Sequence, residues 1–325
     1  MLLKLFRNNG IISPSLLVVC AIAFDFLNRS NTSTDYTSFS PLLSFFPAWH
    51  EQISGLLSRT LFVALTVVMA IFLNVVSVRK TLFTLSNYFV GFSFVVLSFA
   101  LPLNKGMHEV ALFSIPYLAF FITSLRQPSE SRQLEQFLDL GMWLGLATLF
   151  YVPGALLILA LPAISSIQKS REPRIWLASL IGFLSVWLIA YACALLFGVD
   201  LFAHFSLWWD LFSEHYTQLS FTTPKLIALL LVFSLSVFAI YELVVFLHLK
   251  RVNNRRFFKI TLYHTAIAIL MIILQWRFDH NTFFVLAIPL SFLWANFIYY
   301  LPKALWRRAL LELLLLSLIL LSFLF

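Results

Sequence analysis

Residues 136–167 read QFLDLGMWLGLATLFYVPGALLILALPAISSI, an apolar run that Pro153 and Gly154 interrupt near its middle. Proline removes a backbone donor and breaks the hydrogen-bond ladder of a helix. The run is therefore either one kinked helix or two short helices joined by a tight turn. This choice decides the topology, because it inverts the orientation of every segment that follows.

The rest of the chain is equally apolar. Of its 325 residues 61% are hydrophobic and only 11% are charged, which is more apolar surface than a soluble core buries. Backbone amides inside a bilayer must pair internally, so the apolar segments should be helices. We predict an all-α integral membrane bundle of about eleven transmembrane helices, at residues 11–27, 55–78, 82–101, 109–125, 136–151, 154–167, 175–198, 226–249, 260–275, 283–301 and 309–325.

The basic residues select between the two topologies. With a hairpin at 151–154, the amino terminus and the even-numbered connections hold 17 of the 22 lysines and arginines. This bias predicts a cytoplasmic amino terminus and a carboxyl terminus on the outside. A single kinked helix would instead put the basic loop 250–259 outside. The net charge of +8 therefore reports topology and does not indicate nucleic acid as a partner.

The opposite, outer side has a different chemistry. This side holds eight of the fourteen acids, counting those at helix ends, and five of the seven histidines. Two of its connections, 28–54 and 199–224, are long and rich in aromatic residues. Acids and histidines suit proton transfer and cation binding. The alternative is that positive-inside sorting leaves acids outside and that the aromatic residues anchor the bundle at the interface.

Residues 141–162 carry a resemblance. A Gly-Leu-Ala-x-Leu segment precedes a proline-ended apolar run and an arginine-containing loop, which resembles the fifth and sixth spans of C-type (GT-C) glycosyltransferases. The matching residues are Gly145, Leu146, Ala147, Leu149, Pro153, Ala155, Leu156, Leu157, Pro162 and Arg174, whereas Tyr151 stands where those enzymes usually have lysine. The chain is also similar to uncharacterised polytopic proteins of the bacterial inner membrane, where we expect it to reside.

The resemblance implies a layout and a reaction. Residues 1–198 would form a seven-span core with a first outer loop at 28–54, and residues 199–325 would add an outer interfacial segment and four further spans. GT-C enzymes move a sugar from a polyprenyl-phosphate carrier to an acceptor at the outer face of the membrane. Membrane lipid and a polyprenyl-phosphate-linked sugar are the partners that the resemblance implies.

The resemblance also implies a site. Asp25, at the outer end of the first span, occupies the place of the catalytic base, and it reads equally as a helix-end charge. Outer cations would hold the phosphate, although they could simply extend toward lipid headgroups. The expected substrate-binding residues are Arg59, Arg277, His50, Glu51, Asp200, His204, Asp279 and His280. Asp200 and His204 leave open a divalent cation, for which the sequence offers no third ligand.

Two other functions fit the sequence. A transporter or flippase of a small or lipid-linked substrate would use Glu242 and His264 inside the membrane, although these could equally be a contact between helices. Asp139 lies close enough to a basic loop simply to pair with it. The third possibility is a non-catalytic membrane subunit of an envelope assembly complex. No phosphate loop or common hydrolase motif is present, so the sequence leaves open whether the chain is an enzyme.

Overall fold

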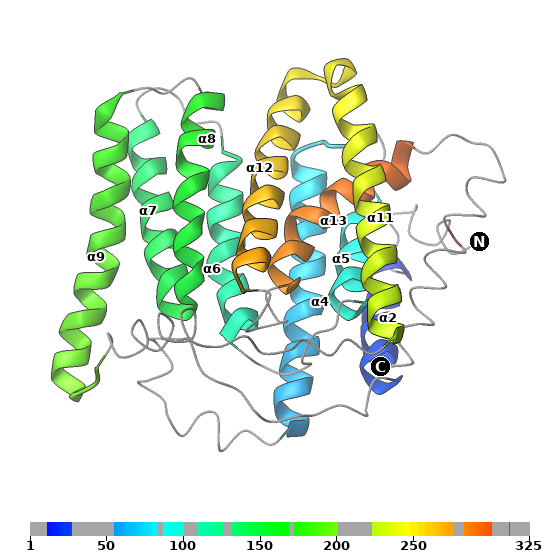
Figure 1. Ribbon diagram of the computed structural model, residues 1–325, viewed down its shortest axis with the longest axis horizontal. Helices are drawn as coiled ribbons and strands as arrows, with labels where there is room; N and C mark the ends of the chain where they lie inside the picture. The colour runs from blue at the N-terminus through cyan, green and yellow to red at the C-terminus, as the bar shows by residue number, and fades with distance from the viewer. Residues whose placement is uncertain are drawn as a thin grey trace.

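A computed structural model describes residues 12–27, 55–83, 87–100, 109–126, 132–168, 172–200, 223–275, 283–300 and 312. Within these ranges the chain forms helices and no strands, which confirms the predicted all-α class. The elements are α2 (Ile12–Leu27), α4 (Gly55–Arg79), α5 (Phe89–Ala100), α6 (Glu109–Ser124), α7 (Gln133–Phe150), η3 (Val152–Leu159), α8 (Ala160–Gln168), α9 (Pro173–Phe197), α11 (Thr223–Phe246), η4 (Leu247–Leu249), α12 (Val252–Gln275) and α13 (Phe283–Tyr300). Figure 1 shows most of them side by side in one bundle.

Five of the described helices are long and apolar enough to cross a membrane. They cover Leu57–Arg79, Pro173–Phe197, Ile227–Leu249, Val252–Leu274 and Phe283–Tyr300. Four further apolar helices are shorter, at Pro14–Ala23, Phe89–Phe99, Val110–Ser124 and Val152–Gln168. Since a spanning helix needs about 20 apolar residues, the five long helices mark an integral membrane protein. The predicted last span, 309–325, lies outside the described residues apart from Glu312.

Two predicted segments have wrong boundaries. In the span predicted at 82–101, the described residues 82, 83, 87 and 88 are not helical, and the helix there is Phe89–Ala100. The Asn87 side chain accepts from the Phe89 amide (Oδ1 to N, 3.2 Å) and replaces a helical bond. The residues predicted as loop at 252–259 instead form the first two turns of α12. Hydropathy marks the part of a helix that suits hydrocarbon, and it does not mark where the helical hydrogen bonds begin.

The hairpin predicted at 151–154 is present. Gln136, at the start of α7, and Gln168, at the end of α8, both donate to the Arg126 carbonyl, at 3.3 and 3.1 Å. The two helices therefore run in opposite directions. Tyr151 adopts an extended conformation (φ −156°, ψ 109°), and Pro153 lies at the start of η3, a 3₁₀ turn that the sequence did not predict. Proline suits this place because the first amides of a helix lack intrahelical partners.

Glycines bring α7 and α9 into direct backbone contact. A Cβ atom on Gly141 would lie 1.9 Å from the Ser179 carbonyl oxygen, and one on Gly182 would lie 2.3 Å from that of Leu138. The Trp187 indole of α9 donates to the Thr148 hydroxyl of α7 at 2.9 Å. Small residues of this kind let membrane helices approach closely. Figure 1 shows α9 at one edge of the bundle, attached along α7.

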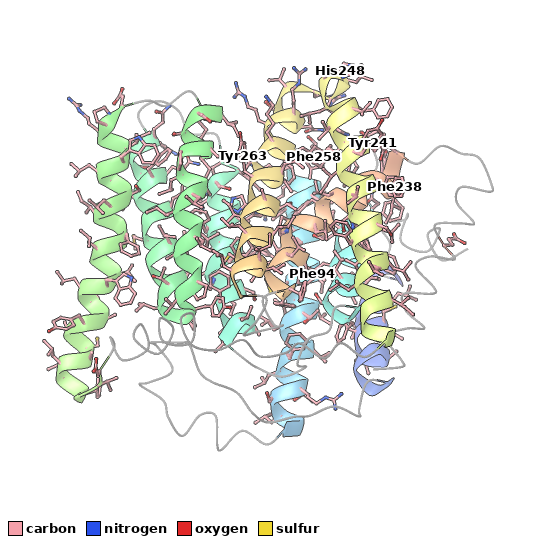
Figure 2. The ribbon with its side chains drawn as sticks, viewed as in Figure 1. Phe94, Phe238, Tyr241, His248, Phe258 and Tyr263 are labelled. Atoms are coloured by element: carbon pink, nitrogen blue, oxygen red, sulfur yellow. The ribbon has the colours of Figure 1, made fainter. Side chains whose placement is uncertain are left out.

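The interior is built around α5 and α13. Nearly every described side chain of these two helices is buried. Phe284 of α13 contacts Phe62 and Phe94, with ring centroids 5.3 and 5.8 Å apart. Figure 2 shows Phe94 within the bundle, whereas Phe238 and Tyr241 lie on the exposed side of α11. Aromatic side chains therefore fill much of the centre of the described bundle.

Candidate functional site

The ends of four helices meet at one end of the bundle, the upper end in Figure 1. The Lys80 ammonium, just after α4, donates to the Leu125 carbonyl just after α6 (Nζ to O, 2.9 Å). Asn254, in the first turn of α12, donates to the Leu82 carbonyl at 3.3 Å. Gln168 adds the end of α8 through Arg126. The basic connections that the sequence placed on one side of a membrane therefore lie together, as far as the structure describes them.

A pocket of about 330 Å³ opens between these helix ends. Such a volume is at the lower end of the range of small-molecule sites. Four cationic side chains line it, together with three carboxamides and an apolar floor. The lining residues are Arg79, Lys80, Thr81, Leu82, Leu125, Arg126, Ile167, Gln168, Asn253, Asn254, Arg256, Phe257 and Ile260. None of these described lining residues is acidic, so the described lining carries an excess of positive charge.

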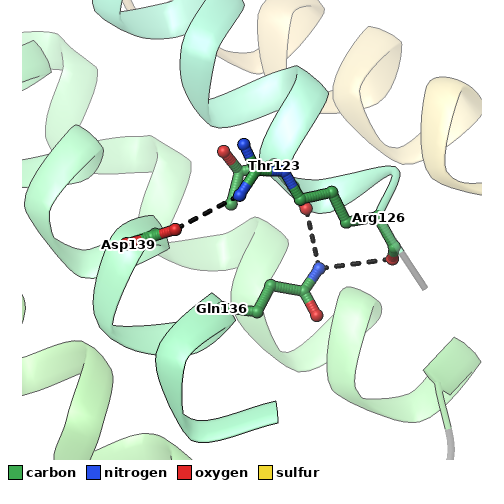
Figure 3. Close-up of polar contacts among 4 residues, drawn as sticks. All are labelled: Thr123, Arg126, Gln136 and Asp139. Atoms are coloured by element: carbon green, nitrogen blue, oxygen red, sulfur yellow. Dashed lines mark hydrogen bonds and ion pairs between the residues drawn. The ribbon is translucent and has the colours of Figure 1, made fainter. Parts of the chain in front are cut away.

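Side chains from three segments, the residue after α4, helix α7 and helix α8, cover the carboxyl end of α6. The last carbonyls of a helix lack partners and carry partial negative charge, which would repel an anion. Here Lys80 donates to Leu125, and Gln136 donates to Thr123 (Nε2 to O, 2.7 Å) and to Arg126, as Figure 3 shows for Gln136. These donors satisfy the exposed carbonyls and weaken their repulsion of an anion in the pocket.

The amino end of α12 adds positive potential. Asn253, Asn254 and Arg256 lie in its first turns and line the pocket. The start of a helix carries the positive end of the helix dipole and unpaired amides, both of which attract anions. Asn254 fixes this end through its bond to the Leu82 carbonyl, so the first turn of α12 stays beside the chain segment that follows α4.

Two of the lining cations have altered surroundings. Burial, and secondarily the neighbouring Arg126 guanidinium, lower the pKa of the Lys80 ammonium below its ordinary value of 10.5. Arg126 itself pairs with Asp139 (Nη1 to Oδ2, 3.3 Å), and the two side chains are 58% and 41% exposed. This pairing, drawn in Figure 3, confirms the interpretation of Asp139 as a partner of the basic loop. At this exposure the pair leaves Arg126 able to bind another anion.

A buried polar pair lies next to the floor of the pocket. The imidazole of His264 is 3.2 Å from the hydroxyl of Ser124 (Nε2 to Oγ), and the ring of Phe121 packs on it at 4.9 Å. Since the Ser124 hydroxyl donates to the Phe121 carbonyl at 2.5 Å, its oxygen accepts from the imidazole. His264 lies one turn beyond Ile260 on α12 and is fully buried. The predicted transport residue is therefore inside the bundle and close to the basic pocket.

The other predicted transport residue, Glu242, has a separate setting. It is half-buried in α11, where Lys250 is its electrostatic neighbour. The Lys250 ammonium donates to the Asn296 carboxamide (Nζ to Oδ1, 2.7 Å) and lies 4.0 Å from the centre of the Tyr300 ring. Burial lowers the pKa of Lys250 to about 8, against an opposing effect of Glu242. The described neighbour of Glu242 is Lys250, next to α13, whereas that of His264 is Ser124 of α6. The described contacts therefore do not join Glu242 and His264 in one site.

Most of the predicted outer site lies outside the described residues. Asp25 lies in α2, but its side chain is not among those described. The other predicted residues outside the described part of the chain are His50, Glu51, His204, Arg277, Asp279 and His280. Arg59 is half-buried near the start of α4, and Asp200 is exposed just after α9. Both lie toward the end of the bundle opposite the pocket. In Figure 1 their helices, α4 and α9, are apart from each other, with α9 at the edge of the bundle. No group of three metal-binding side chains occurs among the described residues. The binding of a divalent cation by Asp200 and His204 stays a prediction, because His204 lies outside the described part of the chain.

Sequence reasoning missed the pocket because it assigned every lysine and arginine there to topology. The carboxamides Gln136, Gln168 and Asn254 carried the missing signal. Amides do not contribute to positive-inside sorting, which counts lysine and arginine. Three of them beside basic connections therefore need another reason, and the structure gives it in their hydrogen bonds to the ends of α4 and α6.

The sequence matches the profile described as "Family of unknown function (DUF6427)" over residues 9–325. The chain belongs to this family, whose function is unknown. No curated protein and no solved structure matches the chain. Nothing in these comparisons connects it to the GT-C glycosyltransferases.

Proposed function

We propose that this DUF6427 protein is a membrane carrier that binds a phosphate-bearing substrate in its basic pocket. The observation that carries the proposal is the convergence of Arg79, Lys80, Arg126 and Arg256, from three helix ends, on one pocket without a lining carboxylate among the described residues. Four cations held this close repel one another, so a bound anion would stabilise the arrangement.

The chemistry of the lining favours phosphate. Guanidinium groups match the geometry of phosphate oxygens and bind them through paired hydrogen bonds. The start of α12 adds the positive end of a helix dipole. By the positive-inside rule this end of the bundle faces the cytoplasm, so the substrate would enter from that side.

Transport suits this site better than group transfer. The described lining holds no carboxylate, histidine or cysteine to act as acid, base or nucleophile. The pocket is in an integral membrane protein and has the buried Ser124 and His264 pair beside its floor. Polar groups inside a membrane bundle commonly mark a substrate or ion path.

Binding to the purified protein in nanodiscs tests the proposal. Labelled inorganic phosphate and methyl phosphate should bind and compete with each other, and Arg126→Ala and Arg256→Ala should each weaken binding about tenfold or more, as expected for the loss of one charged hydrogen bond. Arg174→Ala is the matched control, because Arg174 is an exposed arginine at the start of α9 that does not line the pocket. Uptake of labelled methyl phosphate into proteoliposomes should fall in Arg126→Ala and Arg256→Ala and stay unchanged in Arg174→Ala.

Two results would overturn the proposal. One is that neither phosphate binds to a folded wild-type protein. The other is that Arg174→Ala weakens binding as much as Arg126→Ala, which would reduce the effect to general surface charge.

Glycosyl transfer at the outer face is a separate proposal. What supports it is the segment around Gly145 to Pro162, whose proline turn is a hairpin as the resemblance requires. Its test is Asp25→Asn in the wild-type chain. Loss of sugar transfer from a polyprenyl-phosphate donor, with unchanged phosphate binding at the basic pocket, would support it, and unchanged transfer would remove Asp25 as the base.

A further inference from the structure

We infer that the ligand of the basic pocket is the phosphate ester of a polyhydroxy alcohol, and that Gln168 accepts a hydrogen bond from one of its hydroxyl groups. This inference rests on the proposed phosphate site and names the remainder of its ligand. The class includes free sugar or glycerol phosphates and the headgroup of a lipid that carries the same chemistry.

The orientation of the Gln168 carboxamide follows from its neighbours. Its nitrogen lies 3.1 Å from the Arg126 carbonyl oxygen and 3.5 Å from that of Ser124. Carbonyl oxygens only accept hydrogen bonds, so the amino group must face them. The amide oxygen of Gln168 then points away from the end of α6.

That amide oxygen is left without a donor. Gln168 Oε1 is buried and has no hydrogen-bond partner within the described part of the chain, and Gln168 lines the pocket. A buried acceptor without a partner is costly, so a ligand that supplies a donor gains more than the ordinary worth of one hydrogen bond.

A hydroxyl group is the donor that fits. The ionised oxygens of a phosphate ester accept and do not donate, so they cannot satisfy Gln168. An ammonium group could donate, but Lys80 and the three lining arginines would repel it. A neutral hydroxyl avoids this repulsion, and the carboxamides of Asn253 and Asn254 can contact further hydroxyl groups.

The size of the pocket agrees with this ligand. At about 30 Å³ for each water-sized group, the five heavy atoms of a phosphate fill less than half of a pocket of about 330 Å³. A glycerol or sugar portion would occupy the rest. The apolar floor formed by Leu125, Ile167 and Ile260 can contact its carbon atoms.

The test compares glycerol phosphate with methyl phosphate, which has the same charge and no free hydroxyl. Wild-type protein in phosphatidylcholine nanodiscs should bind glycerol phosphate about fivefold or more tightly, the factor expected for one hydrogen bond. Gln168→Leu should remove this preference and leave the affinity for methyl phosphate nearly unchanged.

Gln136→Leu is the matched control. Gln136 donates to the same Arg126 carbonyl and also has a buried amide oxygen without a described partner, but it does not line the pocket. This variant should keep the preference for glycerol phosphate. If Gln168→Leu does not fold, the comparison of the two ligands on the wild-type protein still tests the polyhydroxy ligand, because equal affinities for the two would overturn the inference without any variant.

The outcomes separate the two proposals. If methyl phosphate and inorganic phosphate do not bind, the proposed function fails. If they bind and glycerol phosphate binds no more tightly, only the inference about hydroxyl groups is wrong. Phosphatidylglycerol and phosphatidic acid in the nanodiscs distinguish a lipid ligand from a free one. If only phosphatidylglycerol competes with glycerol phosphate for the pocket, the ligand is a lipid headgroup. If neither lipid competes, the ligand is a free solute.

Discussion

Asp139 limits the positive charge of the pocket. Its carboxylate lies 3.3 Å from Arg126 and is the acidic partner of a lining cation. We expect Asp139→Asn to strengthen phosphate binding severalfold, because the Arg126 guanidinium then interacts with the ligand alone. Since both side chains are largely exposed, the free energy of unfolding should change by less than about 1 kcal/mol. Titration calorimetry and thermal unfolding measure the two effects, and weaker binding by a stable variant would contradict the prediction.

Lys80 should make phosphate binding sensitive to alkaline pH. Burial and Arg126 lower its pKa below the ordinary 10.5, so Lys80 loses its proton at a lower pH than a free lysine does. Phosphate favours the charged ammonium, so the contribution of Lys80 to affinity is complete below this lowered pKa and disappears as pH rises through it. The lining arginines stay charged over the same range.

Lys80→Arg provides the comparison for this pH effect. An arginine at this position keeps its charge, so the affinity of the variant should stay constant over the alkaline range in which that of the wild type declines. Identical pH profiles for the two proteins would show that Lys80 does not contact the ligand.

Single residues differed in how far the sequence could predict them. Asp139 was predicted as a partner of the basic loop, because the two are near each other along the chain. Gln168 was not predicted, because its contacts with Ser124 and Arg126 join residues 44 and 42 positions apart. Without an alignment of related sequences, one sequence holds no record of such a contact.

At the scale of elements, the packing of α9 on α7 depends on glycine. A methyl group on Gly141 would lie 1.9 Å from the Ser179 carbonyl oxygen, and a backbone atom cannot move aside as a flexible side chain can. We expect Gly141→Ala to separate the helices and to destabilise the protein by at least about 2 kcal/mol, within the usual cost of overpacking. Thermal unfolding in detergent measures the loss.

Gly198→Ala is the control for this substitution. No atom lies within 4 Å of a Cβ at this position, and the strain there comes only from a φ of +66°. We expect a cost of about 1 kcal/mol for that conformation and no change in helix packing. If the two variants melted alike, close backbone contact would not be what holds α9.

Hydropathy predicted where the elements lie better than where they end. Charge bias was enough to predict the reversal at Tyr151, because a single helix there would have put the basic segment 250–259 on the wrong side. The late start of α5 depends on the Asn87 side chain, and the early start of α12 depends on polar residues that hydropathy assigns to a loop. Such boundaries follow from individual hydrogen bonds, which an average over many residues does not detect.

Across the whole molecule, one end of the bundle carries both the topology signal and the pocket. Lys80, Arg126 and Arg256 would hold this end in the cytoplasm and would also bind the ligand. The two roles coincide because a site for a cytoplasmic anion needs cations where sorting already favours them. Positive charge in such loops therefore hides a binding site from sequence analysis, and carboxamides beside it are the better indicator.

This double role makes the orientation of the bundle a direct test. Lys80 and Gln168 line the same pocket, whereas Asp200 follows α9, whose other end carries Arg174. In a variant with Cys20 and Cys193 replaced by alanine, single cysteines at Thr81 and Glu172 should react with an impermeant maleimide only from the cytoplasmic side. A cysteine at Asp200 should react only from outside.

The three positions separate the alternatives for the fold. If Thr81 and Glu172 reacted from opposite sides, the hairpin at Tyr151 would not cross the membrane, and the helices from α9 onward would be inverted. If all three reacted from the reverse sides, the bundle would keep its fold but the pocket would face outward. In that case its substrate would be a phosphate ester outside the cell, and uptake into right-side-out vesicles would need ligand on the outer face.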